Sequence, residues 1–248
     1  MKKILIVVFS LFVLLVSAQK PQHYYVEIKT SKGNILIQLL NETPQHRDNF
    51  KKLIEDGFYD SLLFHRVIHN FMIQTGDPNS RNAADDVLLG NGGPDYTIPA
   101  EIKKELFHVK GALGAARDNN PEKASSASQF YIVQGRKFSN AGLDSLETLR
   151  MKGVKFSDEQ RQAYTTIGGT PHLDGNYTVF GKTLSGLEVV DKIAAVPTNA
   201  KDRPLVNERM AIRLLTKREA ENIERAEKGL KPKKSLFGGG SKSYKLDK

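Results

Sequence analysis

The sequence predicts a mainly β protein, a β-barrel whose ends are covered by two α-helices. Short apolar stretches, either alternating with polar residues or broken by Gly, Asn and Asp, recur along most of the chain. Two amphipathic helices stand isolated among them, one near residue 50 and one near residue 190. The 248 residues are 39% hydrophobic and 26% charged, which excludes disorder throughout and allows a sizeable core.

A β-hairpin and a helix are the first predicted elements. Residues 25–30 and 34–39 alternate apolar and polar side chains on either side of a turn at 30–33. Thr43-Pro44 then indicates a helix start, because Thr caps helices and Pro is favoured in the first turn. Gly57 indicates its end. The apolar face of this helix is formed by Phe50, Leu53 and Ile54.

Short strands and a second helix make up the rest of the predicted body. The stretches 62–74 and 111–133 show no helical period, and their Gly, Asn and Asp residues are typical of a compact barrel or sandwich. Residues 177–182 and 210–215 predict two further strands, and residues 185–195 predict the second helix. Strands flanking isolated helices favour a barrel that the helices plug.

The segment 134–172 does not fit the barrel pattern and predicts a helical insertion. Three leucines at helical spacing predict an apolar helix face: Leu143, Leu146 and Leu149. Ser157 and Gln160 form a capping box ahead of a second helical stretch at 162–167. A disordered insert would lack both features, so we expect a packed subdomain.

The basic charge of the chain is concentrated at its C-terminal end. Residues 217–248 hold ten of the 37 Lys and Arg residues against five acids, so much of the net charge of +9 lies in this tail. The tail predicts a charged helix to about residue 228 and then a flexible polar end. Nucleic-acid binding needs a basic face on a folded domain, so this distribution predicts no nucleic-acid partner.

The first 18 residues have the pattern of a secretory signal peptide. Lys2 and Lys3 precede an apolar run at 4–16, and the small residues Ser17 and Ala18 follow. The run is 13 residues long, whereas a membrane-spanning helix needs about 20. We therefore expect cleavage after Ala18, export to the periplasm or the extracellular space, and no transmembrane segment in the mature chain.

Several common kinds of catalytic chemistry have no motif in this sequence. The chain has no cysteine, which excludes a disulfide framework, a thiolate metal site and a thiol nucleophile. The signatures of serine hydrolases, phosphate-binding loops and zinc proteases are missing. His65 and His69 have a metal-like spacing, but they fall in a strand-like segment without a third ligand nearby. We expect neither a metal nor a cofactor.

The densest cluster of functional side chains spans Phe64 to Asp77. It places Arg66 next to apolar residues, with an amide at Gln74. One interpretation is a core strand with a single arginine whose head reaches solvent. The other is a concave site with a fixed cation, an apolar floor and an amide that can hydrogen-bond to a peptide backbone.

Four motifs occur in one order along the chain. They are Phe64–Asp77, Gly111–Ala116, Ser128–Ile132 and Leu173–Lys182. Together they resemble the signature of the cyclophilins, over about residues 23–216. The resemblance implies a closed eight-stranded antiparallel barrel capped by two helices. It also implies peptidyl-prolyl cis-trans isomerase activity on proline-containing polypeptides, with no cofactor.

The resemblance also implies a role for individual residues. Arg66 corresponds to the catalytic residue of the family. The pocket for the proline ring corresponds to Phe71, Met72, Tyr131 and Leu173. The substrate backbone is expected along Gln74, Ala116, Arg117 and Gln129. His172 and Tyr177 are also expected to contact the substrate. Here the sequence departs from many family members, which often have Trp in place of His172 and His in place of Tyr177.

The expected organisation is a signal peptide (1–18), an isomerase domain (19–216) with the insertion at 134–172, and the tail (217–248). We expect a monomer. Two other functions use the same features. A non-catalytic module could bind proline-containing segments in the same pocket, and a scaffold could be tethered to anionic envelope material by the basic tail.

Overall fold

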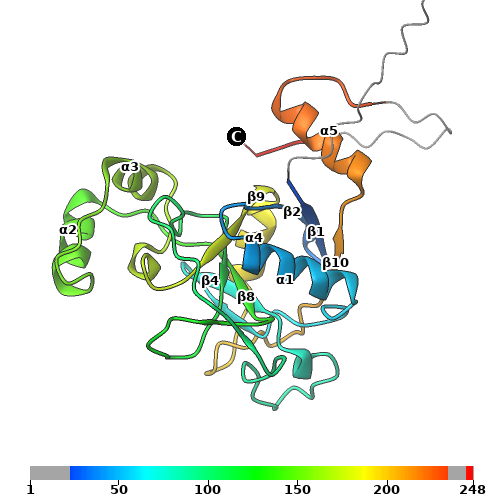
Figure 1. Cartoon of the computed structure of the whole chain (residues 1–248). Coiled ribbons are helices and arrows are strands. Elements are labelled where there is room, and N and C mark those ends of the chain that lie inside the picture. The colour runs from blue at the N-terminus through cyan, green and yellow to red at the C-terminus, as the bar shows by residue number, and fades with distance from the viewer. Residues whose placement is uncertain (1–22, 234–243, 248) are drawn as a thin grey trace, which may run out of the picture.

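An antiparallel β-sheet forms the body of the protein (Figure 1). The computed structural model describes residues 23–233 and 244–247, so the predicted signal peptide lies outside the described residues. The strands of the large sheet are β1 (Tyr25–Thr30), β2 (Gly33–Leu39), β3 (Arg66–Ile68), β4 (Met72–Thr75), β6 (Ala112–Ala115), β8 (Phe130–Val133), β9 (Val179–Ser185) and β10 (Met210–Leu214). Their spatial order is β10-β1-β2-β9-β6-β8-β4-β3, and β5 (Thr97–Ile98) pairs with β7 (Ser125–Ser126) separately. The predicted mainly β architecture and the hairpin at 25–39 are confirmed.

The sheet is curled and open, so the expectation of a closed barrel was wrong. The two edge strands, β10 and β3, do not pair with each other. Only one isolated bridge, between Leu63 and Arg209, joins the segments beside them. Backbone hydrogen bonds from Phe64 N to Glu208 O (2.9 Å) and from Met210 N to Leu62 O (3.0 Å) hold this contact. This contact precedes β3 and consists of a single bridge, so it does not form a strand ladder that would close the barrel.

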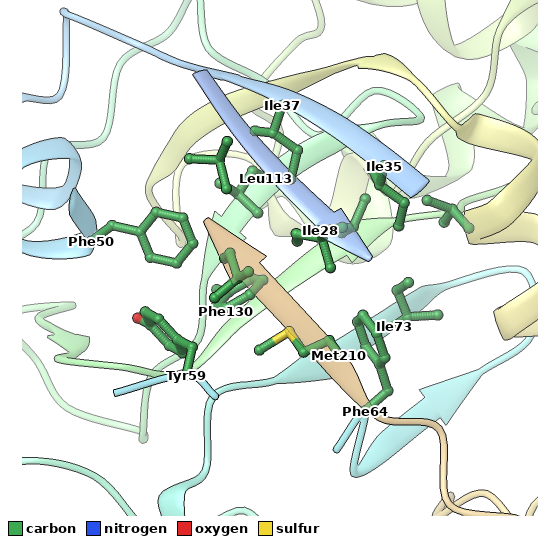
Figure 2. Packing of buried hydrophobic residues seen from close by; sticks show 14 of the residues in the cluster. Ile28, Ile35, Ile37, Phe50, Tyr59, Phe64, Ile73, Leu113, Phe130 and Met210 are labelled. Carbon is green, nitrogen blue, oxygen red and sulfur yellow. The ribbon is translucent and has the colours of Figure 1, made fainter. Parts of the chain in front are cut away.

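The main core lies on the concave side of the curled sheet (Figure 2). Strand alternation turns Ile28 of β1 and Ile35 and Ile37 of β2 inward, and all three are fully buried. Phe50 packs edge-on against Phe130, with ring centroids 5.0 Å apart. Such aromatic contacts add about 0.5–1.5 kcal/mol beyond their area burial.

Two helices, α1 (Pro44–Glu55) and α4 (Leu187–Ala194), pack against the sheet as predicted. Thr43 occupies the N-cap position of α1, but its side chain caps nothing. The carboxylate of Glu101 does so instead, accepting hydrogen bonds from the backbone N–H groups of Gln45 (3.1 Å) and His46 (2.9 Å). A residue distant in sequence thus satisfies the exposed N–H groups at the start of α1.

The segment 134–172 contains two helices, α2 (Asn140–Leu149) and α3 (Asp158–Thr166), on the side of the molecule away from β1 and β10 (Figure 1). Leu143 is fully buried in a cluster with Phe156 and Tyr164. Leu149 is 81% exposed, so it does not share the apolar face that its spacing predicts. Leu149 is six residues after Leu143, and on a helix of 3.6 residues per turn this spacing places the two side chains on different sides of the helix. The Ser157 capping box is present, and α3 therefore starts at Asp158, earlier than predicted.

The fifth α-helix, α5 (Lys217–Glu227), packs Ala220 and Ile223 against the outer side of the hairpin β1–β2. The last described residues also make contacts, which differs from the expected flexible end. Tyr244 and Leu246 join this apolar cluster, and Asp247 N donates to Leu184 O at 2.7 Å. No helix within 23–233 and 244–247 is long and apolar enough to cross a membrane.

Candidate active site

Arg66 is held at one edge of the sheet by two acceptors. It lies directly opposite Gln74 in the register of β3 and β4, and its Nη1 atom donates to Gln74 Oε1 at 3.3 Å. On the other side its Nε atom lies 3.6 Å from Asp202 Oδ2. The Arg66 side chain remains 44% exposed, so the guanidinium is oriented but accessible.

Beside Arg66 lies a pocket of about 130 Å³. Its lining contains nine of the predicted site residues: Arg66, Phe71, Met72, Gln74, Ala116, Arg117, Tyr131, Leu173 and Tyr177. The sheet brings three of them together. Met72 and Gln74 are two residues apart on β4 and share a face, and Tyr131 on β8 lies directly opposite Gln74. The structure thus favours the concave site over a plain core strand.

A glycine makes room for the ring of Tyr131. Gly114 lies opposite Tyr131 in the register of β6 and β8. A Cβ atom at residue 114 would lie 2.3 Å from Tyr131 Cζ, closer than real side chains approach. The Tyr131 ring therefore crosses the backbone at a place that only glycine leaves open.

Gln129 lies outside this pocket, in a neighbouring hollow of about 270 Å³. Its Nε2 atom donates to the carbonyls of Gly90 (2.8 Å) and Gly92 (2.9 Å), and its Oε1 atom accepts from Gln74 Nε2 at 3.1 Å. The hollow shares Gln74, Ala116 and Arg117 with the pocket. The Gln129 amide thus fixes Gln74 and the loop at residues 90–92.

His172 stands at the rim. Its ring stacks on Phe71, with centroids 5.4 Å apart and planes inclined by 28°, but it does not line the pocket. Burial, together with the positive charge of Arg150, lowers the pKa of His172.

Among the residues that line the pocket, Arg117 is paired with Tyr177. The guanidinium of Arg117 lies 4.8 Å from the centroid of the Tyr177 ring, and its Nε atom donates to Asn176 O at 2.9 Å.

Sequence reasoning missed three polar residues around the pocket. Asp202 contacts Arg66 from a distant loop, and its backbone oxygen accepts from Val67 N at 2.8 Å. His108 contacts the hydroxyl of Tyr131, and Asp174 contacts His108. Asp174 lies within the motif Leu173–Lys182, but no local pattern links these residues to the pocket.

The site offers one fixed cation beside an apolar pocket. Within residues 23–233 and 244–247, no three His, Asp or Glu side chains are grouped so as to hold a metal ion. His65 is buried next to Arg66, and burial lowers its pKa to about 4. The Arg66 guanidinium beside an apolar pocket suits a reaction in which a hydrogen-bond donor stabilises a developing lone pair while the pocket binds an apolar group of the substrate.

Comparison with known proteins agrees with this geometry. A model of the family described as cyclophilin type peptidyl-prolyl cis-trans isomerase/CLD matches residues 25–213. The chain belongs to this family. The match covers the large sheet except for the last residue of β10, and it includes all nine residues that line the pocket.

Individual relatives support the same assignment. A bifunctional phosphatase/peptidyl-prolyl cis-trans isomerase of Streptococcus pyogenes is 36% identical over 182 residues, covering 72% of this chain but 36% of that longer protein. A protein of Staphylococcus saprophyticus named as a peptidyl-prolyl cis-trans isomerase is 33% identical, covering 71% of this chain and 83% of its own length. A cyclophilin-type isomerase of Cryptosporidium parvum has the same fold, with a TM-score of 0.58 and 23% identity, covering 78% of this chain and 98% of that one.

Proposed function

We propose that this protein accelerates cis–trans rotation about X-Pro bonds in exported polypeptides, with Arg66 as its catalytic residue. The observation that carries the proposal is the position of the Arg66 guanidinium, which Gln74 and Asp202 orient beside the pocket that contains Met72 and Tyr131. The chain's membership of the cyclophilin-type isomerase family, and relatives that are named as isomerases, support the same activity.

The chemistry requires a donor and no covalent step. Rotation about an amide bond has a barrier of about 18–20 kcal/mol, because conjugation gives the C–N bond partial double-bond character. At the twisted transition state the proline nitrogen loses this conjugation and becomes an acceptor. A donor aimed at that nitrogen therefore stabilises the transition state more than either planar isomer. Arg66 suits this role because its guanidinium stays charged and presents several N–H groups.

The pocket would hold the proline ring while the preceding carbonyl rotates. Met72 and Leu173 are buried in its wall, and Phe71 is packed against them. Gln74 and Ala116 lie between the pocket and the neighbouring hollow, where the backbone of an extended substrate would run. A catalytic amount of protein should speed the slow phase of a proline-limited refolding reaction, which takes about 10–100 s unaided. A slow phase of unchanged rate would contradict isomerase activity.

The exported location rests on the pattern of residues 1–18. An isomerase outside the cytoplasm would act on exported chains, whose folding X-Pro isomerisation can limit. N-terminal sequencing of the protein recovered from outside the cytoplasm tests this directly. Export with cleavage predicts a first residue of Gln19, and an intact Met1 would contradict it.

A further inference from the structure

A chain of buried hydrogen bonds links helix α3 of the insertion to the pocket. The hydroxyl of Tyr164 donates to Asp174 Oδ2 at 2.6 Å, and Asp174 Oδ1 lies 2.8 Å from His108 Nδ1. His108 Nε2 lies 2.9 Å from the hydroxyl of Tyr131. All four side chains of this chain of hydrogen bonds are buried, and the Tyr131 side chain lines the pocket.

The donors in this chain can be assigned from its chemistry. The Asp174 carboxylate can only accept, so His108 Nδ1 carries the proton of their hydrogen bond. Burial raises the pKa of Tyr131 well above its usual range, so its hydroxyl stays protonated and shares a hydrogen bond with His108 Nε2. The Tyr131 hydroxyl is thereby tied to His108, whose side chain is fully buried.

Asp174 is fixed mainly by the insertion and by the backbone of residue 108. The backbone N–H of His108 donates to Asp174 Oδ1 at 2.9 Å. From α3, Gln160 Nε2 donates to Asp174 Oδ2 at 3.2 Å, while the Oε1 atom of Gln160 accepts from Ser157 N at 2.9 Å. One glutamine thus caps α3 and orients Asp174.

The Tyr131 ring is held by packing as well as by its hydrogen bond to His108. Residue 114, directly opposite, is a glycine and contributes no side chain, and the ring packs against those of His108 and Tyr177. A sideways shift of the phenol would change the width of the pocket, because Tyr131 shares its apolar wall with Met72 and Leu173.

We propose that His108 and Asp174 are positioning residues, through which helix α3 of the insertion sets the affinity of the pocket for the segment around an X-Pro bond. This inference rests on the proposed function, since it takes the pocket as the proline site. Loosening α3 at Tyr164 weakens peptide binding only through the Tyr131 hydroxyl.

A double-mutant cycle tests this coupling. The dissociation constant of an Ala-Pro-containing peptide is measured by NMR titration of the full chain for wild type, Tyr164→Phe, Tyr131→Phe and the double variant. Tyr164→Phe keeps the buried ring and removes one hydrogen bond, which we expect to weaken binding about fivefold. In the Tyr131→Phe background the same change should have less than about a twofold effect. Equal effects in both backgrounds would overturn the proposal.

Two matched variants separate coupling from loss of stability. Leu143→Val loosens the same apolar cluster without touching Asp174, so it should lower the melting temperature yet leave the dissociation constant within about twofold. Tyr177→Phe removes a pocket hydroxyl outside the hydrogen-bonded chain, and its effect should add to that of Tyr164→Phe. Weakened binding in Leu143→Val, or a Tyr177 cycle as coupled as the Tyr131 cycle, would show a general effect of packing and would overturn the proposal.

The same samples distinguish this inference from the proposed function. Exchange cross-peaks between the cis and trans forms of the bound peptide report catalysis independently of affinity. A wild-type protein that binds the peptide without catalysing exchange would contradict the isomerase function but leave the coupling measurable. Catalysis with an additive cycle would overturn the coupling alone, and a peptide that does not bind would overturn both.

Discussion

Arg66 and Gln74 face each other across strands β3 and β4, joined by a hydrogen bond of 3.3 Å from Nη1 to Oε1. Gln74 is itself held by Gln129, whose amide bonds to the loop at residues 90–92. An arginine has five N–H donors, and one accepting amide leaves most of them for a ligand. A chain of amides therefore orients the guanidinium and occupies one of its five N–H donors.

Removing this support should slow the enzyme without abolishing it. We expect Gln74→Ala to lower kcat/KM about fivefold to tenfold, since a loosened donor loses part of its preorganised stabilisation. The measurement is the isomerisation rate of an X-Pro peptide. In an Arg66→Ala background the same change should have a smaller effect, because only the contact of Gln74 with the substrate backbone is then left to lose. A full additional loss there would show that Gln74 acts independently of Arg66.

Gly114→Ala should distort the pocket. The added Cβ atom would lie 2.3 Å from Tyr131 Cζ, so the ring must move, and overpacking of this kind costs about 1–3 kcal/mol. We expect a lower melting temperature together with weaker peptide binding. Gly142→Ala in α2 is the matched control, because the nearest atoms to its added Cβ would be Ser139 Oγ at 3.3 Å and Phe138 Cδ1 at 3.9 Å. Equal behaviour of the two variants would argue against the close approach at Tyr131.

Local patterns predicted the parts of the fold that depend on local physics. The hairpin at 25–39 follows from strand alternation. The Ser157–Gln160 capping box is present as predicted, although α3 begins at Asp158, before the predicted stretch at 162–167. Contacts between residues that are distant in sequence could not be predicted from local patterns. Thr43 has the residue type of a cap, yet Glu101 caps α1, and nothing in the sequence near residue 43 indicates this.

The candidate site shows the same difference between features that motifs predict and contacts that depend on the folded chain. The family motifs brought together nine residues that line one pocket. They could not indicate that Asp202 would reach Arg66, because that contact depends on the path of a loop. Nor could they place His172, which stacks on Phe71 at the rim, or show that Gln129 is occupied with the loop at residues 90–92. The open edge between β3 and β10 likewise depends on how the chain bends, which hydrophobic periodicity does not report.

Acid should weaken the attachment of α5. The hydrogen bonds from Arg213, followed by those at Thr216, lower the pKa of Glu219 from 4.5 to about 2. A carboxyl whose pKa is lower in the folded state adds stability above its unfolded pKa and loses it as pH falls through its folded pKa. The difference in unfolding free energy between wild type and Glu219→Gln should therefore shrink as the pH falls from about 5 to about 2. A constant difference over this range would contradict the assigned ion pair.

The C-terminal residues should support stability and not catalysis. Tyr244 and Leu246 pack in the cluster of α5, which lies away from the insertion helices α2 and α3 (Figure 1). No residue of this cluster lines the pocket. A chain ending at Lys228 should keep its isomerisation rate while losing about 1–3 kcal/mol of unfolding free energy, measured in urea. Loss of rate in a truncated chain that remains folded would show that the tail contributes to the site.

The central claim is that Arg66 stabilises the twisted amide, and exchange NMR on an X-Pro peptide tests it most directly. Arg66→Ala should reduce the catalysed exchange rate about 100–1000-fold, which corresponds to about 3–4 kcal/mol of lost transition-state stabilisation. Its amide spectrum should remain that of the folded protein, and Arg66→Lys should recover only part of the rate because it keeps the charge without the rigid donor fork. A folded Arg66→Ala protein that kept more than about half of the wild-type rate, a difference of only about 0.4 kcal/mol, would contradict the account.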